Sequence, residues 1–434
     1  MNVTVLGLWH LGSVIAACTA ATGHTVTGWD PNRATTAALA AGQPPVAEPG
    51  LADLVKSGVD SGRLCFATDL PEAVSNADVV WVAFDTPVDE EDRADVEFVM
   101  DHAIAALPHL KDGALVLTSS QLPIGSVARL ERAWHMVAGG RRASFACSPE
   151  NLRLGKAIDV FMKPDRVVAG VRSAADRERV AALFAPVTDR LEWMSVESAE
   201  MTKHAINAFL ATSVTFINEL AALCEDTGAD AGEVERGLKS ERRIGPAAYL
   251  SPGAAFAGGT LARDVVFLRA IGSRTGRATP LFDGVEASNR LHRDWARRRL
   301  QHEVGDLAHK VVAIWGLTYK PGTDTVRRSM SVELCRWLLD QRALVRVHDP
   351  AVKILPETLR GVVRATSPIE AASGAAALVV ATEWPEYRTV DAAALGAAMP
   401  GGVVLDANRF LQRTLAPGGG LRIVSVGQGD RPPR

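Results

Sequence analysis

Lys203 and Asn207 have side chains whose types and spacing could serve chemistry at an oxygen atom. They lie four residues apart in a segment whose apolar residues recur at helical spacing, and a helix places such a pair on one face. An ammonium and an amide together supply preorganised hydrogen-bond donors where negative charge grows during a reaction. A solvated helix face would carry the same residue types, so the pair by itself leaves both interpretations open.

A glycine-flanked loop near the N-terminus predicts a dinucleotide site. Gly7 and Gly12 bound a segment between an expected strand and an expected helix, and Asp30 follows the next expected strand. In this pattern the helix N-terminus receives the pyrophosphate, and the carboxylate accepts hydrogen bonds from the adenosine ribose. Asp30 therefore favours NAD, although Arg33 keeps NADP open. Trp9 replaces the usual middle glycine, so a strand–turn–helix without a cofactor is the alternative.

Alternating short strands and helices are expected to position these residues. In the first part of the chain, strands are predicted at residues 3–6, 25–29, 79–83, 115–119 and 166–169, with helices at 11–21, 33–41, 97–106 and 126–137. A long helix is predicted from residue 199 to about residue 227, before Gly228. Further strands are predicted at residues 311–315, 345–348, 377–381 and 403–406. The expected fold class is α/β, with two Rossmann-like doubly wound domains joined by a long central helix and a helical domain.

The chain has 434 residues, which is too long for one ordinary core. The predicted parts are a Rossmann domain at residues 1–197, a helical domain at 198–302, a second α/β domain at 303–425 and a disordered tail at 426–434. The formal net charge of −3 gives no electrostatic reason to expect nucleic acid or an anionic membrane as a partner.

Two further observations concern compartment and metals. No apolar run approaches the roughly 20 residues of a membrane span, and the N-terminus lacks the pattern of a signal peptide. The five cysteines are far apart and form no Cys-x-x-Cys pair, which argues against disulfides and a structural zinc site. We therefore expect a cytoplasmic protein without a metal site.

Several different short motifs follow one another along nearly the whole chain. Residues 84–87 read Phe-Asp-Thr-Pro, and residues 148–155 read Ser-Pro-Glu-Asn-Leu-Arg-Leu-Gly. Residues 199–209 read Ala-Glu-Met-Thr-Lys-His-Ala-Ile-Asn-Ala-Phe, and residues 249–264 read Tyr-Leu-Ser-Pro-Gly-Ala-Ala-Phe-Ala-Gly-Gly-Thr-Leu-Ala-Arg-Asp. Residues 316–327 read Gly-Leu-Thr-Tyr-Lys-Pro-Gly-Thr-Asp-Thr-Val-Arg. Together they resemble the motifs of the UDP-glucose/GDP-mannose dehydrogenase family, which has Val-Pro-Thr-Pro at the first of these positions.

The resemblance implies a catalytic role for several side chains. Lys203 and Asn207 correspond to the family residues that stabilise the developing oxyanion and position the substrate. Asp264 corresponds to the aspartate that takes the proton of the sugar alcohol together with a water and the lysine. Glu150 corresponds to a glutamate with acid–base work in a second step, and Ser120 replaces a threonine that holds a water.

The resemblance also implies binding residues. The cofactor-binding residues would be Gly7, Trp9, His10, Leu11, Gly12, Asp30, Arg33, Thr86, Ser120 and Arg327. The substrate-binding residues would be Glu150, Leu152, Lys203, Asn207, Arg243, Tyr249, Phe256, Gly258 and Lys320. NAD is the implied cofactor and a UDP-hexose the implied substrate, with polysaccharide precursor supply as one role. The helical domain would form a homodimer, across which Arg243 reaches the neighbouring substrate.

The sequence departs from the family at the position of its nucleophile. The family oxidises a primary alcohol twice, through a thiohemiacetal and a thioester on a cysteine, where this chain has Thr260. A threonine hydroxyl is far less acidic than a thiol and needs a dedicated base. Leu154 also replaces a glutamate, and Arg263 replaces a lysine.

These departures leave three hypotheses. One is an NAD-dependent oxidoreductase acting on the C6 alcohol of a nucleotide sugar, without the second nucleophilic step. Another is a redox-neutral epimerase or dehydratase that works through a transient C6 aldehyde and shows no net NADH. The last is a non-catalytic protein that binds sugar nucleotides. Retention of Lys203, Asn207 and Asp264 argues against the last one.

Overall fold

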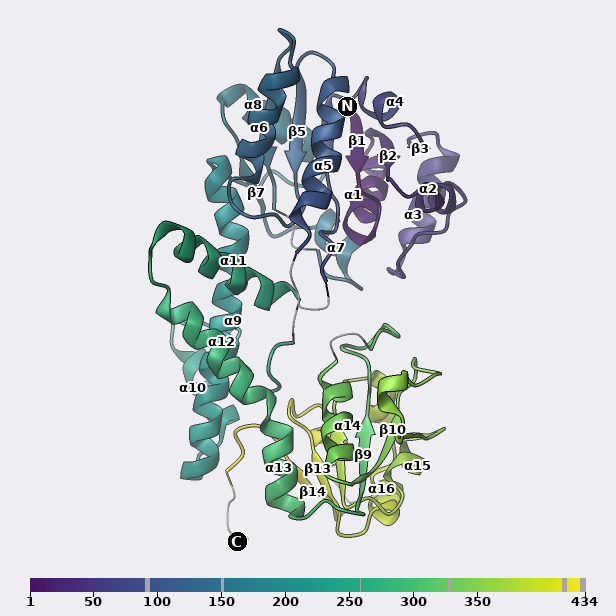
Figure 1. Ribbon diagram of the computed structural model, residues 1–434, viewed down its shortest axis with the longest axis vertical. Helices are drawn as coiled ribbons and strands as arrows, with labels where there is room; N and C mark the ends of the chain where they lie inside the picture. The colour runs from purple at the N-terminus through teal and green to yellow at the C-terminus, as the bar shows by residue number, and fades with distance from the viewer. Residues whose placement is uncertain (90–93, 150–151, 258, 327–328, 416–419, 430–434) are drawn as a thin grey trace. The chain divides into compact units, whose positions relative to one another are not determined.

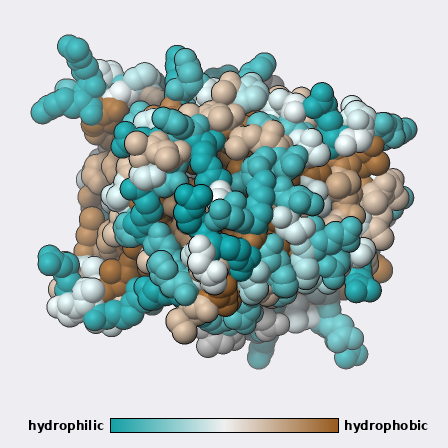
Figure 2. Space-filling view, turned by 90° about the horizontal axis from the view of Figure 1, so that it is seen from above, coloured by the Kyte–Doolittle hydropathy of each residue, from teal (hydrophilic) through white to brown (hydrophobic). Residues whose placement is uncertain are grey.

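The computed structural model describes residues 1–89, 94–149, 152–257, 259–326, 329–415 and 420–429 (Figure 1). The chain divides into two compact units, Met1–Ile206 and Asn207–Arg434. One face of the molecule, shown in Figure 2, is mostly hydrophilic with smaller apolar areas between the polar side chains. This surface is in keeping with a content of 22% charged residues.

The first unit is built on an eight-stranded sheet with the order β3-β2-β1-β4-β5-β6-β7-β8. Its strands are β1 (Asn2–Leu6), β2 (Thr25–Trp29), β3 (Leu64–Ala67), β4 (Val79–Val82), β5 (Ala114–Thr118), β6 (Ala143–Cys147), β7 (Val167–Gly170) and β8 (Leu191–Met194). The strand pairs are parallel except β6 and β7, which are antiparallel. All residues of β4 and β5 are buried, as expected of parallel strands covered by helices on both faces.

Helices cover both faces of this sheet. They are α1 (His10–Ala21), α2 (Arg33–Ala40), α3 (Leu51–Asp60), α4 (Leu70–Val74), α5 (Val96–Ala106), α6 (Ser126–Val137), α7 (Ala157–Met162) and α8 (Ala174–Phe184). One core cluster joins the sheet to α1, α3, α7 and α8, and the other joins it to α4, α5 and α6. The strand order reverses between β1 and β4, so the loops after these two strands meet at the edge where Rossmann folds bind ligands.

Helix α9 (Val196–Thr227) has 32 residues. It starts on the first sheet, where Val196 and Ala199 are buried in the core cluster, and continues into the second unit. Its length and a mean hydropathy of 1.4 over its most apolar window match those of a membrane span, although 44% of that window is buried in the structure. The expectation that no apolar segment approaches the length of a membrane span is therefore too strong for α9. A long helix that packs in a protein core can meet the same criteria of length and hydropathy.

The second unit begins with helices and ends with a six-stranded sheet. The helices before the sheet are α10 (Ala231–Ser240), α11 (Thr260–Thr275), α12 (Pro280–Arg293) and α13 (Trp295–Val304). The strands are β9 (Val311–Trp315), β10 (Leu344–His348), β11 (Val363–Arg364), β12 (Ala377–Val380), β13 (Val403–Leu405) and β14 (Arg422–Val424). The remaining helices are α14 (Met330–Asp340), α15 (Pro368–Ala372), α16 (Ala392–Ala398) and α17 (Gln412–Leu415). The three 3₁₀ turns of the described chain are Leu107–His109, Glu357–Leu359 and Pro385–Thr389.

The second sheet has the order β11-β10-β9-β12-β13-β14, which repeats that of the first six strands of the first sheet. The repeat extends to the turn after the first strand of each sheet. Gly7 donates its amide to Trp29 across 2.9 Å, and Gly316 donates to His348 across 2.8 Å. The prediction of two doubly wound sheets linked by a long helix is confirmed.

Some elements differ from the prediction. Strands β3, β6, β8, β11 and β14 were not expected. Four of them, β3, β8, β11 and β14, have two to four residues and are only partly buried. The predicted disordered tail does not begin at residue 426, because Val426 is fully buried and Gly427 donates its amide to Glu225. Residues 430–434 lie outside the described part of the chain.

Candidate active site

The loop between β1 and α1 has the close packing of a dinucleotide-binding turn. Gly7 adopts a φ of 89°, a conformation that favours glycine. A Cβ on Gly12 would lie 1.7 Å from the carbonyl oxygen of Gly7, so strand and helix approach closely only with glycine here. Trp9 has a φ of −75°, which needs no glycine, and its side chain is 54% exposed. The substitution of the middle glycine is thus accommodated by an indole that faces solvent.

Asp30 lies at the end of β2, as predicted for a ribose-binding carboxylate. Its Oδ2 atom accepts a hydrogen bond from the Leu8 amide at 2.8 Å, and its Oδ1 atom accepts one from Asn32 at 2.9 Å. A carboxylate has about four acceptor positions, so it retains capacity for a ribose hydroxyl. Arg33 begins α2 and is exposed. The loop, the close glycine packing and the half-buried carboxylate fit NAD.

Two further carboxylates lie at the N-terminus of α1. Glu48 is buried and accepts hydrogen bonds from His10 Nε2 at 3.0 Å and from the amides of Gly155 and Ala157. Burial opposes its ionisation, but these donors hold its pKa below the usual value. Asp85 accepts a hydrogen bond from the Leu11 amide at 2.9 Å. Sequence analysis missed both side chains, although the acidic residue inside the Phe-Asp-Thr-Pro motif was a visible signal for Asp85.

A small pocket in the first unit contains Lys203 and Ser120. It lies beyond the carboxyl ends of β5 and β6 and is also lined by Thr118, Cys147 and Glu200. The hydroxyl oxygens of Thr118 and Ser120 are buried and find no hydrogen-bond partner among the described residues. Buried hydroxyls of this kind are usually satisfied by water or a ligand. The predicted juxtaposition of the lysine with a water-holding hydroxyl is consistent with this pocket.

Cys147 does not replace the missing nucleophile. Burial raises the pKa of its thiol far above the usual range, so the thiol stays protonated near neutral pH. A protonated thiol is a poor nucleophile. The pocket therefore offers donors and a lysine, and no thiolate.

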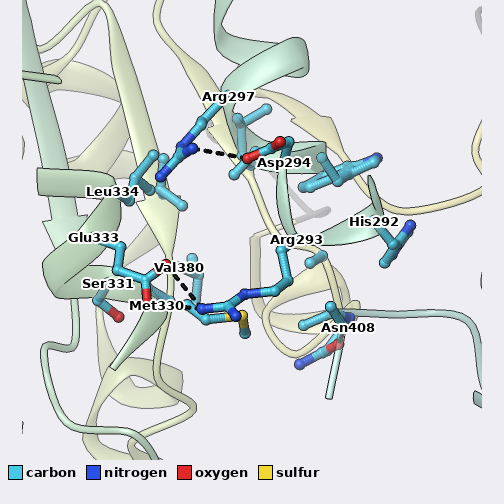
Figure 3. Close-up of a pocket in the computed structure, with 18 of the residues that line it drawn as sticks. His292, Arg293, Asp294, Arg297, Met330, Ser331, Glu333, Leu334, Val380 and Asn408 are labelled. Atoms are coloured by element: carbon cyan, nitrogen blue, oxygen red, sulfur yellow. Dashed lines mark hydrogen bonds and ion pairs between the residues drawn. The ribbon is translucent and has the colours of Figure 1, made fainter. Parts of the chain in front are cut away.

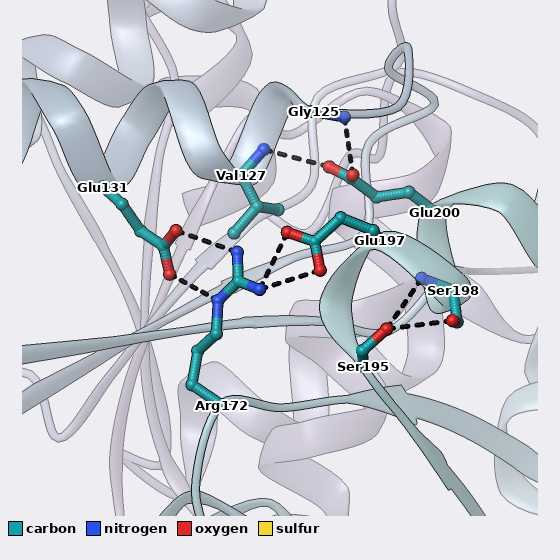
Figure 4. A network of polar contacts seen from close by, with 8 residues as sticks. All are labelled: Gly125, Val127, Glu131, Arg172, Ser195, Glu197, Ser198 and Glu200. Carbon is teal, nitrogen blue, oxygen red and sulfur yellow. Dashed lines mark hydrogen bonds and ion pairs between the residues drawn. The ribbon is translucent and has the colours of Figure 1, made fainter.

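The first turn of α9 is anchored to α6 by charged groups (Figure 4). Glu200 accepts hydrogen bonds from the amides of Gly125 at 2.7 Å and Val127 at 2.9 Å, and its burial raises its pKa. Arg172 binds Glu131 and Glu197 through contacts of 2.7 to 2.8 Å. Because Glu200 lies one turn before Lys203 on α9, this anchor also fixes the position of the lysine.

Asn207 and Asp264 form a buried pair in the second unit. The Nδ2 atom of Asn207 donates to Oδ2 of Asp264, and Asp264 is fully buried. Thr260 is the first residue of α11 and is exposed. It lies four residues before Asp264, hence on the same face of that helix. Helix α9 places Lys203 one turn before Asn207, which confirms the predicted helical spacing.

Amide and imidazole side chains hold the loop that precedes α11. Asn218 accepts a hydrogen bond from the Gly253 amide at 3.0 Å, and His292 Nε2 donates to the Gly253 carbonyl at 2.8 Å. Asn408 accepts one from the Ala254 amide at 2.7 Å. Burial lowers the pKa of His292, which favours its neutral form. None of these supports was predicted, because each comes from a distant part of the sequence.

A cavity of about 340 Å³ lies within the second unit (Figure 3). It is bounded by the carboxyl ends of β12 and β13, the start of α14 and the junction of α12 with α13. Arg290, Arg293 and Arg297 line it; Arg293 pairs with Glu333 at 2.7 Å and Arg297 with Asp294 at 2.8 Å. Arginines at the ligand-binding edge of a Rossmann-like sheet suit an anionic ligand.

The structure places the other predicted site residues as follows. Thr86 is buried and donates to the Gln121 carbonyl at 2.7 Å. Leu152 packs against the first core, and Phe256 packs among the helices of the second unit.

Other predicted site residues lie at least partly at the surface. Tyr249 is 58% exposed. Arg243 is exposed and pairs with Glu241 at 3.0 Å, and Lys320 lies over the ring of Tyr319. Glu150, Gly258 and Arg327 lie outside the described residues. No cluster of potential metal ligands occurs in the described chain.

Comparisons with known proteins cover most of the chain. Three family models match: the UDP-glucose/GDP-mannose dehydrogenase family NAD binding domain at residues 1–188, its central domain at 197–291 and its UDP binding domain at 313–413. The chain is 34% identical to a UDP-glucose 6-dehydrogenase of Pseudomonas aeruginosa, over 90% of this chain and 89% of that protein. It is also 34% identical to one of Rhizobium meliloti, over 99% and 100%. The structure of a UDP-glucose dehydrogenase from Pyrobaculum islandicum superposes with a TM-score of 0.85 at 31% identity and covers 95% of each chain.

The pairing of Asn207 with Asp264 can be measured by a double-mutant cycle. Asn207→Ala removes one donor from a buried carboxylate, and we expect the free energy of unfolding to fall by about 1–3 kcal/mol. Asp264→Asn removes the charge that needs the donor, so the double variant should be less destabilised than the sum of the two. Urea denaturation of the four proteins should give a coupling energy of about 0.5–3 kcal/mol. A coupling energy near zero would show that the two side chains are independent.

Proposed function

This chain belongs to the UDP-glucose/GDP-mannose dehydrogenase family, and we propose that it oxidises the C6 alcohol of a UDP-hexose such as UDP-glucose to the aldehyde. The observation that carries the proposal is the helix that holds Lys203 and Asn207 one turn apart, with Asn207 bonded to the buried Asp264. Relatives named UDP-glucose 6-dehydrogenase support the choice of substrate.

Oxidation of the alcohol removes a hydride from C6 and a proton from its oxygen. The β1–α1 loop and Asp30 would hold NAD, which would supply the hydride acceptor. The chain must take the proton and stabilise the oxygen while it carries negative charge. In the proposal, Lys203 and Asn207 donate hydrogen bonds to that oxygen, and Asp264 receives the proton through a water. The buried hydroxyl of Ser120 lines the same pocket as Lys203 and can hold a water beside the lysine.

The proposed reaction stops after one oxidation because a thiolate nucleophile is missing. Oxidation of an aldehyde through an enzyme-bound ester begins with attack by a deprotonated nucleophile. Thr260 occupies the start of α11, and its hydroxyl remains protonated at neutral pH. Of the described cysteines, Cys147 lies at the Lys203 pocket but is held as a thiol. The aldehyde, or its hydrate, is therefore the expected product.

The nucleotide part of the substrate is proposed to bind in the second unit. The match to the UDP binding domain covers residues 313–413, which include the side of the cavity formed by α14, β12 and β13; the three arginines line the cavity from residues that precede the match. Three guanidinium groups near the start of α14 can counter the charge of a diphosphate. Two of them already pair with carboxylates, so substrate binding would have to exchange or share those contacts.

We also propose that the chain works as a cytoplasmic homodimer. Phe209, Phe216 and Leu223 follow one another at seven-residue intervals on α9 and are 70%, 47% and 60% exposed. This spacing places them along one face of the helix, and apolar stripes of this kind mark protein–protein contacts. A second copy of the same helix is the partner that fits a family dehydrogenase with a helical central domain.

The proposed reaction is tested by incubating the protein with NAD and UDP-glucose. We expect NADH absorbance to rise to a single equivalent per sugar consumed, with mass spectrometry showing the aldehyde or its hydrate. An acid with a second equivalent of NADH would contradict the role given to Thr260. A rearranged sugar without net NADH would favour the redox-neutral alternative, and no reaction with any UDP-hexose would favour a binding protein.

Thr260→Cys should restore the second oxidation. A thiol at the N-terminus of α11 would have a lowered pKa and form a thiolate. We expect the NADH yield per sugar to double and the acid to appear, whereas the control Thr260→Ser should leave the yield unchanged. Adding Leu154→Glu supplies the carboxylate that the family has at that position. An unchanged product from both cysteine variants would show that other residues limit the reaction to one step.

The homodimer is tested by placing a charge on the apolar stripe of α9. Phe216→Asp should convert the dimer to monomer in sedimentation or light-scattering measurements, because burial of an unpaired carboxylate at an apolar interface is costly. Met136→Asp is the matched control, since Met136 is 86% exposed on α6 and away from the stripe. A wild-type protein that is monomeric at micromolar concentration would contradict the proposal.

A further inference from the structure

The N-terminus of α1 is engaged by a carboxylate of the chain itself. In a Rossmann fold the first-turn amides of this helix receive the diphosphate of the dinucleotide, because they lack partners within the helix and lie at its positive end. Here the amide of Leu11, the second residue of α1, donates to Asp85 Oδ2 at 2.9 Å. Asp85 thus uses a donor that the cofactor would need.

The position of Asp85 is fixed by its neighbours. Phe84 is buried against Gly7, since a Cβ on Gly7 would lie 2.5 Å from the Phe84 ring. Thr86 is buried and bonded to the Gln121 carbonyl. With the residues on both sides held in this way, the backbone presents the half-buried Asp85 carboxylate to α1. The contact is therefore part of the loop after β4 and does not depend on a mobile side chain at the surface.

We propose that Asp85 lowers the affinity of this chain for its dinucleotide by competing with the diphosphate for the N-terminus of α1. The proposal rests on NAD binding, which the family match supports, and it does not depend on the sugar reaction. A diphosphate that approaches the Leu11 amide meets a negative charge at hydrogen-bond distance from the same donor. Binding then requires the Asp85 carboxylate to move away from the Leu11 amide. The binding energy of the ligand has to offset both the lost hydrogen bond and the remaining repulsion between the carboxylate and the diphosphate.

Two other carboxylates lie near this helix end. Asp30 is bonded to the Leu8 amide, and Glu48 to the side chain of His10. Those two carboxylates accept from donors other than the Leu11 amide, so their presence does not block it. Asp85 is distinguished from them because it occupies a first-turn amide. A neutral side chain at position 85 should therefore release the site without disturbing the ribose end.

The test compares the binding of ADP-ribose, NAD and adenosine to wild type, Asp85→Asn and Asp85→Ala by calorimetry. ADP-ribose carries the diphosphate but has no nicotinamide, so its binding is independent of any sugar oxidation. We expect both variants to bind ADP-ribose and NAD about tenfold more tightly, a ratio that corresponds to about 1.4 kcal/mol. Adenosine, which lacks phosphates, should bind all three proteins equally, and the gain for ADP-ribose should shrink at high salt.

Asp95→Asn is the matched control. Asp95 caps α5 through the Phe98 amide at 3.0 Å, so this variant removes the same charge from a helix N-terminus in the same region of the chain. It should leave the affinity for ADP-ribose unchanged. Asp85→Asn keeps an oxygen that can accept a hydrogen bond from the Leu11 amide, whereas Asp85→Ala does not. Comparing the thermal unfolding of these two variants therefore shows how far the contact between residue 85 and Leu11 stabilises the fold without ligand.

Three outcomes would overturn the proposal. One is unchanged or weaker binding of ADP-ribose in both Asp85 variants. Another is an equal gain for adenosine, which would indicate a general opening of the loop instead of competition for the diphosphate. The third is an equal gain in Asp95→Asn, which would assign the effect to net charge.

Discussion

Backbone amides at the starts of helices and loops must find acceptors, and in both units of this protein carboxylates supply them. Glu200 accepts two amides at the start of α6, Glu48 accepts two before and within the first turn of α7, and Asp406 accepts two after β13. An unsatisfied buried amide costs about 1–3 kcal/mol, so each pairing determines which chain segments can lie together. The Asp406 contacts are local, but Glu200 and Glu48 meet amides that are at least 73 residues away in the sequence, so these two carboxylates tie distant loops and helices together.

The same constraint shapes the candidate active site. The anchor of α9 at Glu200 and Arg172 fixes the start of the helix, and the helix then fixes Lys203 and Asn207 by its own geometry. The chemistry is therefore divided between a rigid helix, which carries the donors, and the short loop before α11. Asn218 and Asn408 accept hydrogen bonds from amides of that loop, and His292 donates to its Gly253 carbonyl. Thr260 lies at the junction of such a loop with a helix, where one residue decides whether a thiolate is available.

The sequence predicted those parts of the site that depend on local spacing. The turn at Gly7 and Gly12, the carboxylate at Asp30 and the pair on α9 follow from short-range patterns of glycine placement and helical period. The supports could not be predicted, because Asn408 meets Ala254 from 154 residues away and Glu48 meets Gly155 from 107 residues away. Asp85 falls between these cases: its residue type was visible inside a motif, but its contact with α1 depends on the pairing of β1 with β4.

The repeated strand order of the two sheets places two corresponding aspartates in different surroundings. The aspartate after β10, Asp349, is 2% exposed, and it corresponds in position to Asp30 after β2. Its two oxygens accept from the amides of Leu317, Thr318, Ala351 and Val352 and from the indole of Trp384. Those donors use up the acceptor capacity of a carboxylate, whereas Asp30 has two amide donors and remains half-buried. In the second copy of the scaffold the protein's own donors thus occupy the carboxylate, whereas the first copy leaves its carboxylate able to accept a hydrogen bond from a ribose.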